Sequence, residues 1–246
     1  MPRRPRSDGR CIHCRKKMPK KTKDHVFPSA WYPDSTPATV QRWTAPSCER
    51  CNGESGEKEK QLLVRLALCI NPQKLEVQGL AKRALASLGI GVTGLDDEEM
   101  RARKALRDGV FKDARPYTGE NKEHIIPGLE VHPEAPPGQQ LEIDIPSNTL
   151  WDVAKKIVRG SEYWLADGRI IEPPLEIDVL MVPAEELPTE VAQLIAFFGQ
   201  AHLGPGLRLR RGAAQDGSGA VLYEIVVWDT ITLYCSILPP ETEFDT

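Results

Sequence analysis

The chain has 246 residues, with a hydrophobic content of 40% and a charged content of 27%, which is typical of a globular protein. No apolar run approaches the length of a membrane-spanning helix, and the basic start MPRRPRSDGR is not followed by the apolar segment of a secretory signal. These features exclude a transmembrane helix, and we expect a cytoplasmic protein with no membrane partner.

The charge is unevenly distributed along the chain. Residues 1–70 contain 15 Lys and Arg against 7 Asp and Glu, a net charge of +8, whereas the remaining residues carry a net charge of −11. A basic front and an acidic rear favour contact between the front and a polyanion such as nucleic acid. The alternative is a basic arm that only improves solubility.

Four of the six cysteines form two C-x-x-C pairs, Cys11 with Cys14 and Cys48 with Cys51. Thiolates three residues apart can face one Zn²⁺, and two such pairs complete a closed tetrahedral site. A closed site has no open position for water, so the predicted zinc is structural and stabilises a module that buries little apolar surface. A redox C-x-x-C pair is the alternative.

Between the two cysteine pairs lies the dipeptide Asp24-His25. Adjacent residues of a strand point to opposite faces, so the two side chains can take different roles. A carboxylate can hold a hard divalent cation, and an imidazole can accept a proton from water. Alone, the dipeptide is also compatible with an exposed turn pair.

Helices are predicted beyond the second cysteine pair. Apolar residues at helical spacing favour a helix over 61–70, ended by Asn71-Pro72, and a second over about 73–88, ended by Gly89. A third is expected to begin at Asp96-Asp97. Residues 71–126 are therefore predicted to be a helical connecting segment, and residues 127–140 a Pro-rich linker.

The rear of the chain changes from helical to alternating hydrophobic periodicity. Strands are predicted over 141–145, 175–179, 207–211, 221–228 and 231–238. Helices are predicted over 150–158, capped by Ser147 or Asn148 and closed by Gly160, and over 189–198. Residues 141–246 are expected to form an α+β domain of unassigned role, with a core separate from that of the front.

The string from Cys11 to Glu59 resembles the HNH endonuclease family. Two C-x-x-C knuckles flank an Asp-His-Val-x-Pro stretch, and Cys-Asn opens a helix at the second knuckle. The resemblance covers residues 11–70. It implies a treble-clef-like ββα-metal fold around one divalent ion, so the predicted fold class is α+β: a zinc-stapled ββα-metal module over residues 1–70, a helical middle segment and a C-terminal α+β domain.

The resemblance also implies roles for individual residues. His25 would be the general base, and Asp24 and Asn52 would hold a catalytic Mg²⁺ or another divalent cation. Lys58 would contact phosphate, and Glu57 or Glu59 would bind the ion or hydrogen-bond one of its ligands. The alternative for each of the three is a solvated charge on the helix surface. The basic residues expected to contact the nucleic-acid backbone are Arg15, Lys16, Lys17, Lys20 and Lys21.

Two positions depart from the family pattern. Trp43 stands where the family has an Asn that braces the base histidine, and Ser55 stands where it has a Lys. Gln41 lies on the same predicted strand face as Trp43 and is a possible substitute for the missing amide. Trp43 itself is expected to be a hydrophobic lid on the small module.

Three functions remain open on these grounds. The leading one is a metal-dependent endonuclease that hydrolyses phosphodiester bonds, with DNA as the expected partner. The alternative is a non-catalytic zinc-knuckle protein that only binds nucleic acid, and a third is a protein-interaction scaffold. The Asp24-His25 pair favours the enzyme, because a binding module has no use for a metal ligand beside a base.

Overall fold

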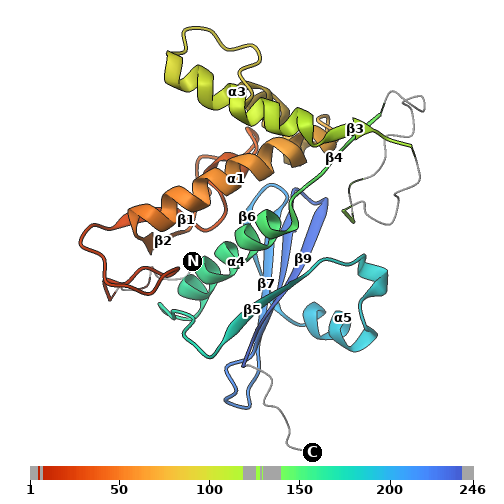
Figure 1. Ribbon diagram of the computed structural model, residues 1–246. Coiled ribbons are helices and arrows are strands. Elements are labelled where there is room, and N and C mark those ends of the chain that lie inside the picture. The colour runs from red at the N-terminus through yellow and green to blue at the C-terminus, as the bar shows by residue number, and fades with distance from the viewer. Residues whose placement is uncertain (1–4, 6–7, 119–125, 128, 130–139, 240–246) are drawn as a thin grey trace, which may run out of the picture.

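The computed structural model describes residues 5, 8–118, 126–127, 129 and 140–239, and these form a mixed α+β structure (Figure 1). In the front, β1 (Thr22–His25) pairs antiparallel with β2 (Thr44–Ser47), with His25 opposite Thr44. Helix α1 (Glu49–Cys69) follows directly. The α+β class and the strand–strand–helix order agree with the sequence, whereas the HNH fold itself stays a prediction.

The helices of the middle segment differ in detail from the predicted ones. Helix α1 begins at Glu49, close to Cys51-Asn52, where the resemblance implies a helix start, and continues through the predicted 61–70 segment. Residues 73–88 form a 3₁₀ turn (Leu75–Val77) and α2 (Leu80–Ser87) in place of one helix. Gly79 separates the two with a left-handed φ of 81°, which only glycine adopts without strain. Helix α3 (Asp97–Lys112) begins as predicted, because the Asp96 side chain accepts a hydrogen bond from Glu99 N.

The rear contains a five-stranded antiparallel sheet in the order β5-β9-β8-β7-β6. Its strands are β5 (Glu176–Leu180), β6 (Gly199–Gly204), β7 (Leu207–Ala213), β8 (Val221–Val227) and β9 (Ile231–Leu238), and α5 (Thr189–Ala196) precedes β6. Strand β6 was not predicted, because it contains no β-branched or aromatic residue.

A short strand pair flanks the Pro-rich segment. Strand β3 (Ala114–Pro116) lies before it and pairs antiparallel with β4 (Leu141–Ile143), which lies after it. Most of the predicted linker over 127–140 is outside the described residues. The two sides of the segment are therefore joined by backbone pairing.

Helix α4 (Ser147–Leu165) lies between α1 and the sheet and contacts both (Figure 1). The predicted end at Gly160 was wrong, because the helix continues for five residues. A Cβ at Gly160 would lie 2.8 Å from Val26 Cγ2, so this glycine lets the helix approach the front closely. The predicted cap was also wrong, because Pro146 is the N-cap residue and no side-chain cap forms.

The buried residues form one continuous core. It runs from Trp43 and Leu66 in the front, through Ile157 and Trp164 of α4, to Tyr223 in the sheet. The Trp43 ring is buried and stacks on Trp164, with centroids 5.3 Å apart and planes inclined by 10°. The expectation of two separate cores was therefore wrong, and α4 belongs to both parts.

Candidate metal centre and buried charge cluster

The four paired cysteines come together. Cys11 and Cys14 lie in the loop before β1, Cys48 is the N-cap residue of α1, and Cys51 lies in the first turn of that helix. Their Sγ atoms all lie within 4.8 Å of one another, with Cys14 Sγ 3.9 Å from Cys48 Sγ. Four thiolates with Zn–S bonds of about 2.3 Å need a separation close to this, so the group suits one metal ion and suggests a structural zinc.

The cysteine loop favours the deprotonated form of one ligand. Burial acts to raise the pKa of Cys11, but backbone N–H groups of Cys14, Cys48 and His13 donate hydrogen bonds to its sulfur and lower the pKa to about 6. The thiolate is the form that binds metal. The loop therefore favours the thiolate form of Cys11, which is the form that can coordinate a metal ion.

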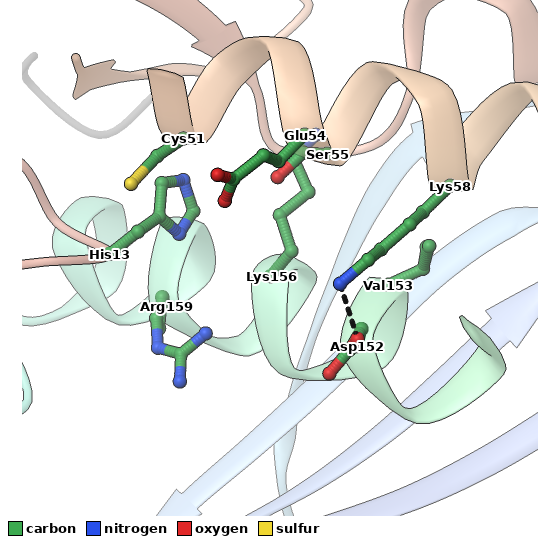
Figure 2. A pocket seen from close by; sticks show the side chains of 9 residues that line it. All are labelled: His13, Cys51, Glu54, Ser55, Lys58, Asp152, Val153, Lys156 and Arg159. Carbon is green, nitrogen blue, oxygen red and sulfur yellow. Dashed lines mark hydrogen bonds and ion pairs between the residues drawn. The ribbon is translucent and has the colours of Figure 1, made fainter. Parts of the chain in front are cut away.

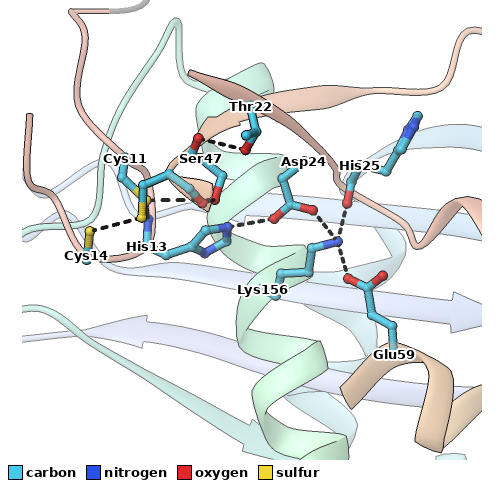
Figure 3. Close-up of polar contacts among 10 residues, drawn as sticks. Cys11, His13, Cys14, Thr22, Asp24, His25, Ser47, Glu59 and Lys156 are labelled. Carbon is cyan, nitrogen blue, oxygen red and sulfur yellow. Dashed lines mark hydrogen bonds and ion pairs between the residues drawn. The ribbon is translucent and has the colours of Figure 1, made fainter. Parts of the chain in front are cut away.

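A cluster of buried charges lies beside the cysteines (Figure 3). The Asp24 carboxylate is 4% exposed, with Oδ2 2.8 Å from His13 Nε2 and Oδ1 2.9 Å from Lys156 Nζ. The Lys156 ammonium, from α4, also lies 2.6 Å from Glu59 Oε1 and donates a hydrogen bond to the backbone oxygen of His25. Two carboxylates, one from β1 and one from α1, therefore converge on a single cation.

The two carboxylates respond differently to this shared cation. Burial acts to raise the pKa of Asp24, but the hydrogen bond to His13 and the charge of Lys156 outweigh it and lower the pKa. For Glu59 burial prevails over the attraction of Lys156, and its pKa is raised. One ammonium thus stabilises the charge of Asp24 more fully than that of Glu59.

The His25 ring lies on the other face of β1 from Asp24 (Figure 3). Burial and the positive charges of Lys156 and Arg42 lower its pKa, which favours the neutral imidazole near pH 7. Its Nδ1 atom is buried and makes no hydrogen bond to any described residue. Gln41 is exposed, so the suggested brace by its amide is not formed in this structure.

Other predicted site residues lie apart from Asp24. Asn52 is half-buried in the first turn of α1, and its side chain makes no hydrogen bond within the described part of the chain. Lys58 pairs with Asp152 of α4 at 2.6 Å, and Glu57 is exposed. The structure therefore brings Glu59 to Asp24, but not Asn52.

The basic residues expected to contact nucleic acid are all exposed: Arg15, Lys16, Lys17, Lys20 and Lys21. Lys20 Nζ lies 2.5 Å from Glu49 Oε1, in an ion pair open to solvent. This basic stretch borders the cysteine group because Arg15 follows Cys14 directly.

Two members of the charge cluster, His13 and Lys156, were not identified from the sequence. His13 lies inside the first C-x-x-C pair, where a polar residue is held close to the first strand. Lys156 lies on the apolar stripe of α4 with Val153 and Ile157, and a lysine on such a stripe indicates a buried partner. That position was the available signal for Lys156.

Comparison with known proteins gives no relative: no protein family, curated protein or solved structure matches the chain. The fold and site therefore define the class on their own, as a mixed α+β protein with a four-cysteine group at metal-binding distance. Within the described residues, no helix combines the length and the apolar character needed to cross a membrane.

Proposed function

We propose that this chain is an HNH-type endonuclease that hydrolyses phosphodiester bonds of nucleic acid, with DNA as the expected substrate. The observation that carries the proposal is the convergence of Asp24 and Glu59 on one cation beside the β1–β2 hairpin. The sequence resemblance implies a strand carboxylate and residues of the following helix around one divalent ion, and Asp24 and Glu59 are such a pair, with the Lys156 ammonium as the cation between them here.

Zinc in the four-cysteine group has a structural role in this proposal. The four cysteine sulfurs would fill all positions around the ion and leave none open for water or substrate. A bound zinc would tie the loop before β1 to the start of α1. It would thereby fix the hairpin that carries Asp24 and His25.

The residues around Lys156 fit a hard divalent cation in part. Carboxylate oxygens of Asp24 and Glu59 are ligands of the type that Mg²⁺ prefers, but the Lys156 ammonium lies between them and Asn52 does not join them. A bound divalent ion would supply charge neutralisation at the phosphate. The ion set proposed here is therefore Asp24 with Glu59, in place of Asp24 with Asn52.

The remaining chemistry belongs to residues of this chain. His25 accepts the proton of the attacking water, since its lowered pKa keeps the imidazole in the basic form near pH 7. Lys156 holds Asp24 ionised and in place. The exposed basic residues from Arg15 to Lys21 attract the polyanionic substrate.

A second candidate function is nucleic-acid binding without cleavage. It is favoured by one observation: the Asp24 carboxylate is 4% exposed and both of its oxygens are already paired. In that case the charge cluster is purely structural. The exposed basic stretch then accounts for the whole function.

Plasmid nicking with added Mg²⁺ or Mn²⁺ separates the two candidates. We expect the zinc-loaded protein to nick, His25→Ala to lose cleavage while keeping its affinity for DNA, and Asp24→Asn to lose cleavage. His202→Ala is the matched control, because His202 is an exposed histidine of β6 in the rear sheet. A zinc-loaded wild type that binds DNA but never cleaves it, or RNA, would establish the binding protein instead.

A further inference from the structure

A pocket lies between α1 and α4, next to Cys51 (Figure 2). Its volume is about 140 Å³, many times the roughly 10–15 Å³ that one water needs. Five of the side chains that line it are charged, and one carries a hydroxyl: Glu54, Ser55, Lys58, Asp152, Lys156 and Arg159. The pocket is therefore large and polar enough for a small ionic group.

The acidic groups of the pocket already have partners. Asp152 pairs with Lys58 at 2.6 Å, and Glu54 lies 3.7 Å from Arg50 on the same helix. The Lys156 ammonium, which also lines the pocket, pairs with Asp24 and Glu59, neither of which lines it. None of these groups forms an ion pair with Arg159.

Arg159 is a cation of this pocket that has no partner among the described residues. Its guanidinium is half-buried and makes no hydrogen bond or ion pair with any of them. Burial and the positive charge of Arg15, in the cysteine loop, lower its pKa, and the nearby Asp152 carboxylate offsets this only in part. A further anion in the pocket beside Arg159 would stabilise its charged form.

The geometry points to a phosphate site: we propose that this pocket binds a phosphate group of a nucleic-acid strand, with Arg159 as the residue that contacts it. The guanidinium matches the oxygens of a phosphate, and Ser55 and Lys58 offer further donors at the wall. The identity of the strand rests on the proposed function, but the phosphate site does not depend on cleavage.

One competing role for Arg159 is to balance the thiolates, because Cys51 and Cys11 also attract its charge. The test must therefore follow zinc as well as phosphate. It uses the full-length, zinc-loaded protein and a labelled single-stranded DNA oligonucleotide, at constant ionic strength and without added divalent ions. Affinity is read by fluorescence anisotropy and zinc content by metal analysis.

We expect Arg159→Gln to bind the oligonucleotide about tenfold more weakly than wild type, the loss that removal of one charged hydrogen-bond partner produces. Arg159→Lys should lose less, because it keeps the charge. Lys155→Gln is the control on the same helix, removes the same charge outside the pocket, and should bind nearly as wild type does. Zinc content should be equal in all four proteins.

Inorganic phosphate gives an independent test that needs no variant. It should displace the oligonucleotide from wild type at concentrations where chloride of equal ionic strength does not. Absence of this displacement, unchanged affinity in Arg159→Gln, or loss of zinc from that variant would each overturn the proposal. If Arg159→Gln cleaves and binds as wild type does, the phosphate site fails while the nuclease stands. If the wild type never cleaves but Arg159→Gln weakens its binding, the nuclease fails while the phosphate site stands.

Discussion

Helix α4 takes part in a buried charge cluster on each side: toward the front hairpin it supplies the cation Lys156, and toward the rear sheet it supplies the carboxylate Glu162. In the rear, Glu162 of α4 is fully buried and accepts hydrogen bonds from Arg211 at 2.8 and 2.9 Å, from Arg169 at 2.8 Å and from the Tyr223 hydroxyl. In the front, one lysine serves both Asp24 and Glu59.

This difference indicates which cluster is structural. Burial acts to raise the pKa of Glu162, but its arginine and tyrosine partners outweigh burial and lower it, whereas the pKa of Glu59 is raised. A carboxylate with a full set of donors stabilises the fold and offers no bonding capacity to a ligand. The front cluster sets two carboxylates against one lysine and His13, and this is the place where the proposed divalent cation would bind.

Among the changes that separate front from rear, removal of zinc is expected to cause the largest loss of stability, and to cause it in the front. Structural zinc contributes about 10–16 kcal/mol in small zinc modules, so a strong chelator should unfold the β1–β2 hairpin. Hydrogen exchange should show loss of protection in β1 and β2, and loss of the Trp43–Trp164 stack should change the near-ultraviolet circular dichroism. Purified protein should carry about one zinc per chain.

Because the core is continuous, the sheet should be weakened by chelation but keep its backbone pairing. Protection in β8 and β9 is the internal control. Zinc-free protein with a protected hairpin would contradict the structural role of the ion.

Replacement of the rear carboxylate, Glu162, should cause the next largest loss of stability. Glu162→Gln leaves Arg211 and Arg169 without their shared anion, and breaking a buried pair in this way costs about 3–5 kcal/mol. Urea denaturation with zinc present measures it. Glu172→Gln, at an exposed ion pair with Arg10, is the matched control and should change stability far less than Glu162→Gln does. Equal effects of the two substitutions would show that the Glu162 cluster contributes no more to stability than an exposed ion pair.

Contact between α4 and the front can be tested at Gly160. A methyl group there meets Val26 at 2.8 Å, and overpacking of this kind costs about 1–3 kcal/mol, so Gly160→Ala should lower stability. Gly109→Ala in α3 is the control, since nothing lies within 4 Å of its added Cβ. That change should be neutral or stabilising by up to about 1 kcal/mol, through helix propensity alone. A stable Gly160→Ala protein would show that α4 is not tightly packed against Val26.

Sequence reasoning located the parts of this molecule that depend on local pattern. The cysteine spacing predicted the four-cysteine group, and Asp96 predicted the start of α3. Alternating apolar residues predicted four of the five strands of the rear sheet. These features depend on residues close in the chain or on a strict spacing. The same local reasoning placed helix ends poorly where a glycine has a tertiary role, as at Gly160.

The members of the charge cluster were harder to find because their contacts join distant segments. Lys156 meets Asp24 across 132 positions of the sequence, and no local spacing indicates that meeting. Asn52 was assigned to the cation from its place after the second cysteine pair, but the side chain turned toward Lys156 is that of Glu59, two helical turns later. Tertiary packing of α4 on α1, which the sequence does not reveal, decides which carboxylates converge.

The smallest expected effect is a pH dependence at Glu59. Its folded-state pKa is raised above the unfolded value of about 4.3, mainly by burial, so the folded state penalises the charged form. Wild type therefore loses stability as pH rises from about 4.3 through the folded pKa, whereas Glu59→Gln does not. The stability of Glu59→Gln relative to wild type should rise over this range and then level off. Denaturant unfolding from about pH 5 to about pH 7.5, with zinc present, measures it.

Asp216→Asn is the control for this slope, because Asp216 lies in the turn between β7 and β8, far from Glu59, and hydrogen bonds from Ser218 lower its pKa, so its titration lies below that range. Its stability relative to wild type should be constant between the same pH limits. The stability of Glu59→Gln relative to wild type could also prove constant over this pH range. Lys156 would then balance both carboxylates, and the front would have no uncompensated negative charge. The front cluster would then be as complete as the Glu162 cluster, and the case for a cation site at Asp24 and Glu59 would fall with it.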